Sequence, residues 1–354
     1  LCAPRWGTIE QGAMESLEID VGIHMFDWNE RKVLITGATG FIGSWLTEAL
    51  LKRGADVTAL VKKDDPLIVS LRDVSDRVLY VYGDVRDRNA VDRAVVEQEI
   101  VFHLAAITQV ILAIQNPTET FHVNVLGTLN ILESLRMNNA NQYIVFASSD
   151  KVYGEPKYLP IDEEHPLSAK SPYDASKLAA DRLGYSYYRT YGIDVSIVRW
   201  SNTIGGRDAN ILRAAPDFIT SIIDGKPPTI RGNGQHVRDY MYVTDAVSAM
   251  ISVAENRNIC KGEAFNFGTE KPTAVTELAN MVIRLMGCQT KMKPKVLGQP
   301  TPGEIDKQYL SSKKARELIK WKPQVDLEEG LLMTIEWYKE NSWWRSTMSA
   351  LMAS

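Results

Sequence analysis

Over its first two hundred residues, the chain alternates between short apolar segments and longer amphipathic ones. Six apolar runs without polar alternation predict buried strands at 32–36, 57–61, 78–82, 100–103, 143–147 and 195–199. Between them, apolar residues recur at helical spacing near 44–53, 87–97, 118–138 and 173–191. Uniformly apolar strands interleaved with helices indicate a parallel sheet covered on both faces. The pattern therefore predicts an α/β protein built on a Rossmann-type, doubly wound parallel sheet.

The residue pattern of the sequence changes after residue 199. Glycine and proline clusters appear at 205–206, 227–228 and 232–234, and two amphipathic stretches follow near 273–287 and 327–340. We expect these segments to form a smaller α/β C-terminal lobe that binds the substrate. The predicted division is a terminal tail at 1–30, a dinucleotide-binding domain at 31–199 and 236–268, and the substrate lobe at 200–235 and 269–345.

Composition and charge exclude several classes of function. The 40 lysines and arginines and 44 aspartates and glutamates give a net charge of −4 without a long basic block, so nucleic acid binding is not expected. No apolar run approaches the ~18–20 residues that span a bilayer, and the first thirty residues lack the pattern of a secretory signal. Three scattered cysteines favour free thiols in a reducing compartment over a disulfide framework or a metal site. We therefore expect a cytoplasmic protein with no metal and no membrane attachment.

A glycine triad follows the first predicted strand and opens the first predicted helix. In that position Gly37 permits a tight turn, Gly40 lets the backbone approach a pyrophosphate, and Gly43 allows close packing of helix on strand. The helix N-terminus then offers unpaired N–H groups to the phosphates. An ordinary glycine-rich turn is the alternative, but the strand–turn–helix context favours a dinucleotide site.

The residues after the second predicted strand indicate whether the dinucleotide is NAD or NADP. A carboxylate at the strand end would bind both ribose hydroxyls of NAD, but Val61 occupies that position. Lys62 and Lys63 follow it and would suit the 2′-phosphate of NADP, unless the two lysines are simply exposed. We therefore expect NADP, with NAD possible. Asp84 is a candidate acceptor for the adenine amino group.

Three residue types suited to proton transfer from an alcohol stand around the predicted carboxyl edge of the sheet. Tyr173 and Lys177 are one helical turn apart and project from the same face. A free tyrosine has a pKa near ~10, and a nearby ammonium group would lower it. Ser149, just after the predicted strand at 143–147, would share a substrate hydroxyl with Tyr173.

Six motifs in this order carry a resemblance to a known family. The segments 37–43, 103–106, 124–128, 148–154, 173–177 and 238–243 together resemble the extended short-chain dehydrogenase/reductases that act on nucleotide sugars, over about residues 31–340. The resemblance implies a tightly held nicotinamide cofactor and a homodimer joined by a four-helix bundle from 118–138 and 173–191. The cofactor would be bound by Gly37, Thr39, Gly40, Phe41, Ile42, Gly43, Lys62, Lys63, Asp84, Val85, Leu104, Ala105, Ala106, Thr108, Asn124, Tyr173 and Lys177.

Within that family, the pair after the catalytic serine points to a reaction. Asp150 and Lys151 are similar to the acid–base pair of sugar 4,6-dehydratases, especially the CDP-glucose type. The run Val61-Lys62-Lys63 instead is similar to that of GDP-mannose 4,6-dehydratases, so the nucleotide stays open. The resemblance implies that Asp150 protonates the hydroxyl leaving carbon 6 and that Lys151 removes the proton from carbon 5. The alternatives are a 4-epimerase on the same scaffold and, more remotely, a non-catalytic protein that senses NADP.

A diphosphate needs a cation and directed donors. Arg238 resembles the family's phosphate-binding arginine, although pairing with Asp239 or Asp245 would leave it a structural residue. Asn202 resembles the asparagine near that arginine, and the alternative for it is a turn-capping amide. The substrate-binding set implied by the resemblance is Thr108, Ser149, Asn202, Arg231, Arg238 and Glu304.

Overall fold

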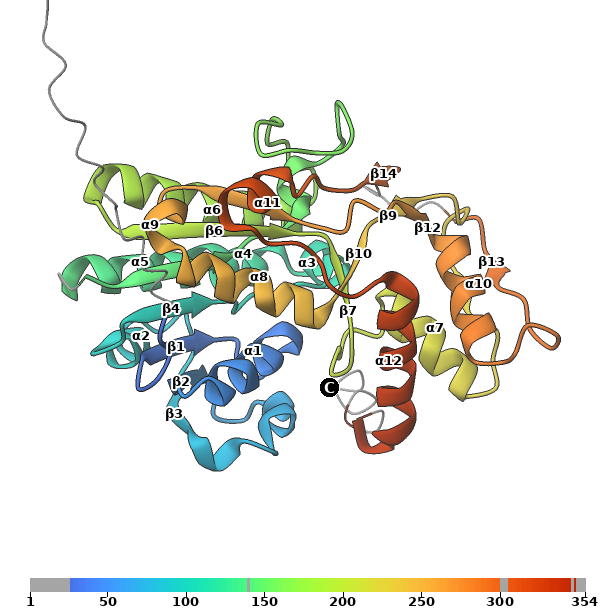
Figure 1. The fold of residues 1–354 in the computed structure, drawn as a ribbon, viewed down its shortest axis with the longest axis horizontal. Coiled ribbons are helices and arrows are strands. Elements are labelled where there is room, and N and C mark those ends of the chain that lie inside the picture. Colours follow the sequence, from blue (N-terminus) through green and yellow to red (C-terminus); the bar gives the residue numbers. More distant parts are fainter. Residues whose placement is uncertain (1–25, 139–140, 300–304, 345–346, 348–354) are drawn as a thin grey trace, which may run out of the picture.

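The computed structural model describes residues 26–138, 141–299, 305–344 and 347. Its centre is a seven-stranded parallel sheet in the order β11-β6-β5-β4-β1-β2-β3 (Figure 1). The strands are β1 (Lys32–Thr36), β2 (Asp56–Val61), β3 (Val78–Tyr82), β4 (Ile100–His103), β5 (Tyr143–Ala147), β6 (Asp194–Trp200) and β11 (Ala264–Phe267). The six predicted strands are confirmed, each within one residue at either end. The seventh, β11, has only four residues and was not predicted.

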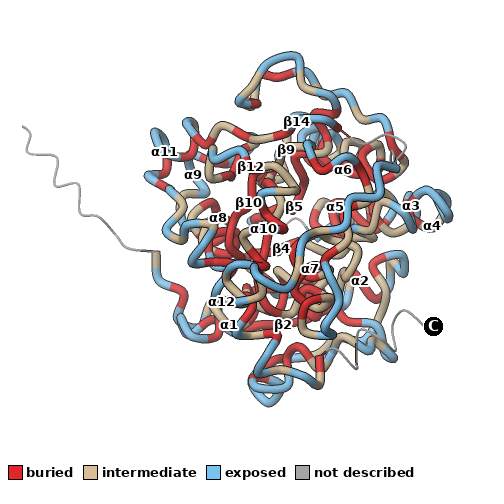
Figure 2. The backbone as a smooth tube through the Cα atoms, turned by 90° about the vertical axis from the view of Figure 1, so that its right-hand side faces the viewer, coloured by how far each residue is buried: buried red, intermediate tan, exposed pale blue. Residues whose placement is uncertain are grey.

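Helices cover both faces of this sheet because successive strand residues point to opposite sides. In β1, Val33 and Ile35 pack with α1 (Phe41–Lys52) and α8 (Val243–Glu255) on one face. Leu34 packs on the other face with α2 (Arg88–Val95), α5 (Gly127–Asn138) and α6 (Pro172–Tyr191). Figure 2 shows the buried positions gathered along these central strands. The doubly wound, Rossmann-type fold is confirmed.

A smaller lobe lies beside the carboxyl edge of the sheet. Helices α7 (Ala214–Ile223), α10 (Val275–Leu285) and α12 (Leu327–Glu340) pack together there around a separate apolar core (Figure 1). Its small sheets pair β7 (Asn202–Ile204) with β10 (Tyr240–Tyr242), β8 (Thr229–Ile230) with β13 (Lys295–Val296), and β9 (Val237–Arg238) with both β12 (Thr273–Ala274) and β14 (Lys307–Gln308).

Three segments differ from the predicted division. Strands β9 and β10 fall in the range assigned to the dinucleotide-binding domain, yet they belong to the small sheets of the lobe. Helix α11 (Lys313–Ile319) and Trp321, assigned to the lobe, pack into the core of the main sheet. Trp28, assigned to the tail, is buried and its Nε1 donates to Glu255 at 2.8 Å. Packing over long sequence separations decides all three, and residues 1–25 of the predicted tail lie outside the described part of the chain.

Candidate active site

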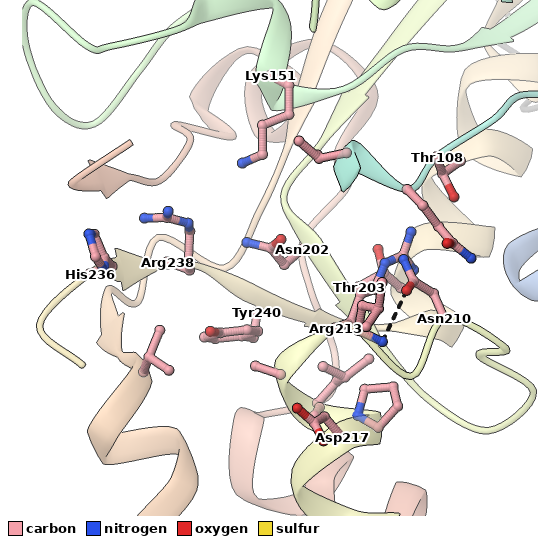
Figure 3. A pocket seen from close by; sticks show the side chains of 18 of the residues that line it. Thr108, Lys151, Asn202, Thr203, Asn210, Arg213, Asp217, His236, Arg238 and Tyr240 are labelled. Carbon is pink, nitrogen blue, oxygen red and sulfur yellow. Dashed lines mark hydrogen bonds between the residues drawn. The ribbon is translucent and has the colours of Figure 1, made fainter. Parts of the chain in front are cut away.

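Two cavities meet at the carboxyl edge of the main sheet. One, of about 460 Å³, lies beside the glycine turn between β1 and α1. The other, of about 390 Å³, extends into the lobe between β7, β9 and α7 (Figure 3). Thr108, Tyr173 and Arg213 line both cavities. A ligand in the first cavity would therefore meet a ligand in the second at Tyr173.

The glycine turn is packed too tightly for side chains. Gly37 has a φ of +72°, and a Cβ atom there would lie 2.8 Å from the backbone nitrogen of Ala105. A Cβ atom on Gly43 would lie 2.0 Å from the carbonyl oxygen of Gly37. Because no side chain fits at these positions, the cavity wall at the start of α1 consists of backbone atoms. The unpaired N–H groups of a helix N-terminus suit a pyrophosphate.

Most of the predicted cofactor residues line this first cavity. They are Gly37, Thr39, Gly40, Phe41, Ile42, Gly43, Lys62, Asp84, Val85, Leu104, Ala105, Ala106, Thr108, Tyr173 and Lys177. Lys63 and Asn124 are not among its lining residues. Asn124 is buried in a π-helical turn, η3 (His122–Leu126), where its side chain accepts from the backbone nitrogen of Ile107 at 2.7 Å and donates to the hydroxyl of Ser176 at 2.8 Å. Asn124 thus positions the loop that carries Thr108.

Asp65 is one of the carboxylates of the first cavity that sequence reasoning missed. It caps the short helix η1 (Pro66–Leu71), accepting from the backbone nitrogen of Leu67 at 3.0 Å. Its other oxygen accepts from the hydroxyl of Thr39, in the glycine turn, at 2.6 Å. The Asp65-Pro66 pair is a recognisable helix-start signal, but the return of that helix toward Thr39 depends on tertiary packing.

Tyr173 lies in the first turn of α6, which a capping box between Ser171 and Asp174 begins. Burial raises the pKa of Tyr173 to about 12, while the Arg213 guanidinium and the Ser149 hydroxyl lower it. The ammonium group of Lys177, the cation that the sequence places one helical turn from this phenol, donates to the Ala147 carbonyl. Burial lowers the pKa of Lys177 to about 8.

Ser149, Asp150 and Lys151 follow the end of β5 and all line the second cavity. The Ser149 hydroxyl donates to Oδ1 of Asp150 at 3.1 Å and accepts from the backbone nitrogen of Lys151 at 3.2 Å. Oδ2 of Asp150 accepts from Nζ of Lys151 at 3.3 Å. Burial lowers the pKa of Lys151, Asp150 raises it, and the charge on Arg238 lowers it further. The pair therefore combines a carboxylate with an amine whose proton is held less tightly than in water.

Arg238, on β9, lines the lobe side of the cavity. One of its guanidinium nitrogens donates to the carbonyl of Val237 at 2.8 Å. The two carboxylates considered as structural partners are engaged elsewhere: Asp239 accepts from the backbone of Thr269, and Asp245 from the backbone of Gln324. The structure therefore leaves Arg238 at the cavity wall, where a phosphate group can reach it.

Asn202 lines the same cavity, and its amide nitrogen points toward Arg238, with Lys151 nearby (Figure 3). Within the described ranges this buried nitrogen has no hydrogen-bond partner. An unmet buried donor costs about 1–3 kcal/mol, which a bound acceptor would recover. Arg231 also lines the cavity, 3.8 Å from Asp217. Glu304 lies outside the described residues.

Arg213 was not singled out from the sequence. It precedes α7, pairs with the buried Asp208 at 3.1 Å and lines both cavities beside Tyr173. Its segment shows no periodic signal, so only the fold brings it to the phenol. In the part of the chain that the structure describes, no cluster of three His, Cys, Asp or Glu residues is arranged to hold a metal, and no helix is long and apolar enough to cross a bilayer.

Comparison with known proteins agrees with this arrangement. Residues 34–334 match the family model described as GDP-mannose 4,6 dehydratase. The chain is 34% identical to a putative UDP-glucose 4-epimerase of Methanocaldococcus jannaschii, with 88% of this chain and 99% of that one aligned. It is 32% identical to a dTDP-glucose 4,6-dehydratase of Streptomyces antibioticus, with 88% and 94% aligned.

A solved structure shares the fold closely. The dTDP-glucose 4,6-dehydratase DesIV of Streptomyces venezuelae, solved with NAD bound, superposes with a TM-score of 0.82 at 28% identity, covering 89% of this chain and 99% of that one. This chain therefore carries its glycine turn, its Tyr173–Lys177 pair and its two adjoining cavities on the same fold as that solved structure. The chain belongs to the GDP-mannose 4,6 dehydratase family, within the extended short-chain dehydrogenase/reductases that include nucleotide-sugar dehydratases and epimerases.

Proposed function

We propose that this protein is an NDP-hexose 4,6-dehydratase, which converts a nucleotide-activated hexose to its 4-keto-6-deoxy derivative. One observation carries the proposal: Asp150 and Lys151 line the second cavity directly beside Ser149 and Tyr173. Oxidation and reduction at carbon 4 need only the serine, tyrosine and lysine. A further carboxylate–amine pair on the same wall supplies the acid and base that loss of water requires.

The first cavity fits a nicotinamide dinucleotide. The bare glycine turn and the start of α1 would hold the pyrophosphate, while Tyr173 and Lys177 line the end that adjoins the second cavity. When bound, the cofactor supplies the redox chemistry by taking hydride from carbon 4 and returning it to carbon 6.

The wall that would contact the adenosine ribose carries two opposite charges. Lys62 suits the 2′-phosphate of NADP, whereas the Asp65 carboxylate suits the free ribose hydroxyls of NAD and repels a 2′-phosphate. Because Lys63 does not line the cavity and Asp65 is fixed by Thr39, we expect NAD to bind more tightly than NADP. The NAD bound to the Streptomyces venezuelae relative supports this choice.

The first half of the reaction forms a ketone at carbon 4. Tyr173 accepts the proton of the carbon-4 hydroxyl, which Ser149 also binds, as hydride leaves that carbon. Arg213 favours the phenolate form of Tyr173, because its positive charge offsets part of the cost of burial. The new ketone makes the hydrogen on carbon 5 acidic.

The second half removes water from the sugar. Transfer of a proton from Nζ of Lys151 to Oδ2 of Asp150 converts the pair to an amine and a carboxylic acid. Lys151, as the amine, then accepts the proton from carbon 5, and Asp150, as the acid, donates its proton to the hydroxyl leaving carbon 6, so water departs and a carbon–carbon double bond forms. Hydride then adds to carbon 6 while Lys151 returns its proton to carbon 5. The proton gained by Tyr173 balances the one given by Asp150, so the sugar loses only water.

The substrate would lie along the second cavity with its hexose at Tyr173. Arg238 and the unmet amide of Asn202 would bind the diphosphate, and Arg231 lines the same cavity. Positively charged and amide donors on one side of the cavity suit a ligand with two phosphates.

The second candidate is a 4-epimerase, which the similarity to the Methanocaldococcus jannaschii relative favours. Incubation with UDP-, dTDP-, CDP- and GDP-hexoses separates the two. A dehydratase yields a product lighter by one water in mass spectrometry, and that product must carry a 4-keto-6-deoxy sugar by NMR. A product of unchanged mass with inverted carbon 4 would replace our proposal with the epimerase.

Lys151→Met tests the assignment of the acid–base pair. It should abolish loss of water but still allow oxidation at carbon 4, so reduced nicotinamide should accumulate and be seen by its absorbance. The matched control is Lys157→Met, because Lys157 is exposed in the following loop and should not affect turnover. Full dehydration by Lys151→Met would contradict the role of this lysine.

A further inference from the structure

Gln308, which the sequence analysis did not single out, contacts both members of the Asp150–Lys151 pair. It lies on β14 and is 1% exposed. Its Nε2 donates to the backbone carbonyl of Asp150 at 2.9 Å, and its Oε1 accepts from Nζ of Lys151. One amide therefore holds the backbone of the carboxylate residue and the side chain of the amine at the same time.

The position of this amide restricts the direction in which the lysine nitrogen can react. The nitrogen is tetrahedral: one bond goes to its own carbon, one N–H is directed at Gln308, and another at Oδ2 of Asp150, 3.3 Å away. The remaining position holds the third proton of the ammonium group or the lone pair of the amine. Since Lys151 lines the second cavity, that position is the one left to face a substrate.

We propose that Gln308 is a positioning residue that holds the Lys151 nitrogen with its reactive position directed at carbon 5 of the bound hexose. The proposal rests on the proposed 4,6-dehydratase function and deepens it. Gln308 is not among the lining residues of either cavity, so it would act through Lys151.

The strand that carries Gln308 also connects this lysine to the proposed phosphate site. In the pairing of β14 with β9, Gln308 lies opposite Arg238. The backbone nitrogen of Val237 donates to the carbonyl of Asp306 at 2.9 Å, and the Arg238 guanidinium donates to the same carbonyl at 3.2 Å. In Figure 3, Lys151, Asn202 and Arg238 converge on one part of the cavity. A diphosphate bound at Arg238 would thus place the hexose in register with the nitrogen that Gln308 holds.

A neutral amide suits this role better than a charged side chain. The charged groups that act on Lys151 are Asp150 beside it, Asp174 on α6 and Arg238 on β9. The amide oxygen of Gln308 orients the Lys151 nitrogen through a hydrogen bond. It adds no negative charge that would stabilise the ammonium form of Lys151. A carboxylate at the same position would favour the ammonium form and make the lysine a poorer base.

Two nearly isosteric variants test the proposal. Gln308→Glu keeps an acceptor but adds a negative charge, and Gln308→Met removes both hydrogen bonds at similar volume. Gln324→Glu is the control, since Gln324 is exposed and its side chain donates to the carbonyl of Lys322 in its own loop. Each variant is first checked for wild-type circular dichroism and for unchanged affinity for the nucleoside diphosphate that binds the wild type.

The first measurement does not depend on turnover. Acetic anhydride modifies only the free amine, so the pH dependence of Lys151 labelling, followed by peptide mass spectrometry, reports the proton affinity of Lys151. Gln308→Glu should move the labelling midpoint to higher pH by about one unit or more. Gln308→Met should move it to lower pH, because an acceptor for the ammonium group is lost. Midpoints equal to the wild-type value in both variants would overturn the proposal.

The second measurement follows the proton at carbon 5. With the 4-keto-6-deoxy product in deuterated water, Gln308→Met should exchange the carbon-5 hydrogen about tenfold or more slowly than wild type, because misplaced reacting groups lose rate steeply. KM should stay near its wild-type value while kcat falls. Wild-type exchange in this variant would contradict the positioning role.

The two measurements separate the two hypotheses. If the wild type yields no 4-keto-6-deoxy product while Gln308→Glu and Gln308→Met still shift the pH midpoint of Lys151 labelling, the dehydratase assignment is wrong, but Gln308 does interact with Lys151. If wild type dehydrates its substrate but neither midpoint nor exchange responds, the positioning role fails and the dehydratase stands.

Discussion

At the scale of single residues, Tyr173 combines a demand for ionisation with an environment that resists it. Burial raises the pKa of its phenol to about 12, far above neutral pH. In the proposed reaction, the Ser149 hydroxyl and the Arg213 charge would together lower the cost of ionising this phenol. We expect the Tyr173 hydroxyl to contribute to the reaction rate by proton transfer and to contribute little to substrate affinity.

Replacing Tyr173 by Phe removes that proton acceptor and keeps the ring. We expect kcat to fall by about 10²–10⁴, the usual contribution of a positioned acid–base group, with the affinity for nucleoside diphosphate unchanged by calorimetry. Tyr187→Phe on the same helix is the control, because Tyr187 donates to Glu133 and lines neither cavity. Comparable loss in both variants would indicate damage to α6 and not to the chemistry.

At the scale of elements, His103 joins β4 to β1 and α5. Its Nδ1 lies 2.7 Å from the Thr36 hydroxyl, and its Nε2 lies 3.0 Å from the Thr128 hydroxyl, which itself donates to the Asn124 carbonyl. Both ring nitrogens are therefore satisfied in the neutral form, with the proton on Nε2. Burial lowers the pKa of His103 to about 3, so the folded protein resists charging this ring.

This gives a pH dependence of stability with a definite sign. Between the unfolded pKa of 6.5 and the folded pKa of about 3, the unfolded chain binds more protons, so stability falls as pH falls through that window. At about 1.4 kcal/mol per pH unit, His103 should account for about 2–3 kcal/mol lost between pH 7 and pH 4.5. In urea unfolding experiments, the free energy of unfolding of His103→Gln should decrease less between pH 7 and pH 4.5 than that of the wild type. Parallel curves for variant and wild type would exclude this origin.

The segment joining β2 to η1 should set the cofactor preference. Asp65→Asn removes the negative charge from the ribose end of the first cavity while keeping an oxygen that can accept from Thr39. We expect weaker binding of NAD and tighter binding of NADP, measured by fluorescence titration, because Lys62 then faces the 2′-phosphate without an opposing carboxylate. Lys63→Gln is the control, since Lys63 does not line the cavity. An unchanged ratio of the two affinities would remove Asp65 from cofactor selection.

At the scale of the whole molecule, α5, α6 and the turns preceding α5 leave large apolar side chains exposed. They include Phe121, Leu126, Met137, Tyr185 and Tyr191, each at least 38% exposed. These helices correspond to the stretches for which the family resemblance implies a four-helix dimer interface. Burying such side chains against a second copy would be favourable at roughly 25 cal/mol per Å² of apolar surface.

Light scattering during size-exclusion chromatography tests this arrangement. We expect the wild type at twice its chain mass of 39.7 kDa, and Leu126→Glu shifted toward the single-chain mass because a charge would be buried at the interface. Leu79 lies on β3, the edge strand at the far side of the sheet from β6, on which α6 packs. Leu79→Glu also replaces an exposed leucine and should leave the mass unchanged. A wild-type mass of one chain would contradict the dimer.

Local patterns determined much of this protein in advance. Apolar runs located six of the seven main strands, because an unbroken apolar segment can be satisfied only inside a covered sheet. Spacing along one helix brought Tyr173 and Lys177 onto one face, and a glycine triad after a strand marked the first cavity. Each of these signals lies within a few consecutive residues, where backbone geometry alone relates the side chains.

Contacts between distant segments were decided by the tertiary structure. Gln308 meets Lys151 across 157 positions in sequence, and Asp65 meets Thr39 across 26. Arg213, at the start of α7, likewise lies near Tyr173 only because the lobe packs beside the carboxyl edge of the sheet. Periodicity reports which face of an element is buried, but it carries no information on which distant side chain covers it. The residues that shift the pKa values of this site depend on that packing, so the sequence predicted the candidate reacting groups and the fold selected their neighbours.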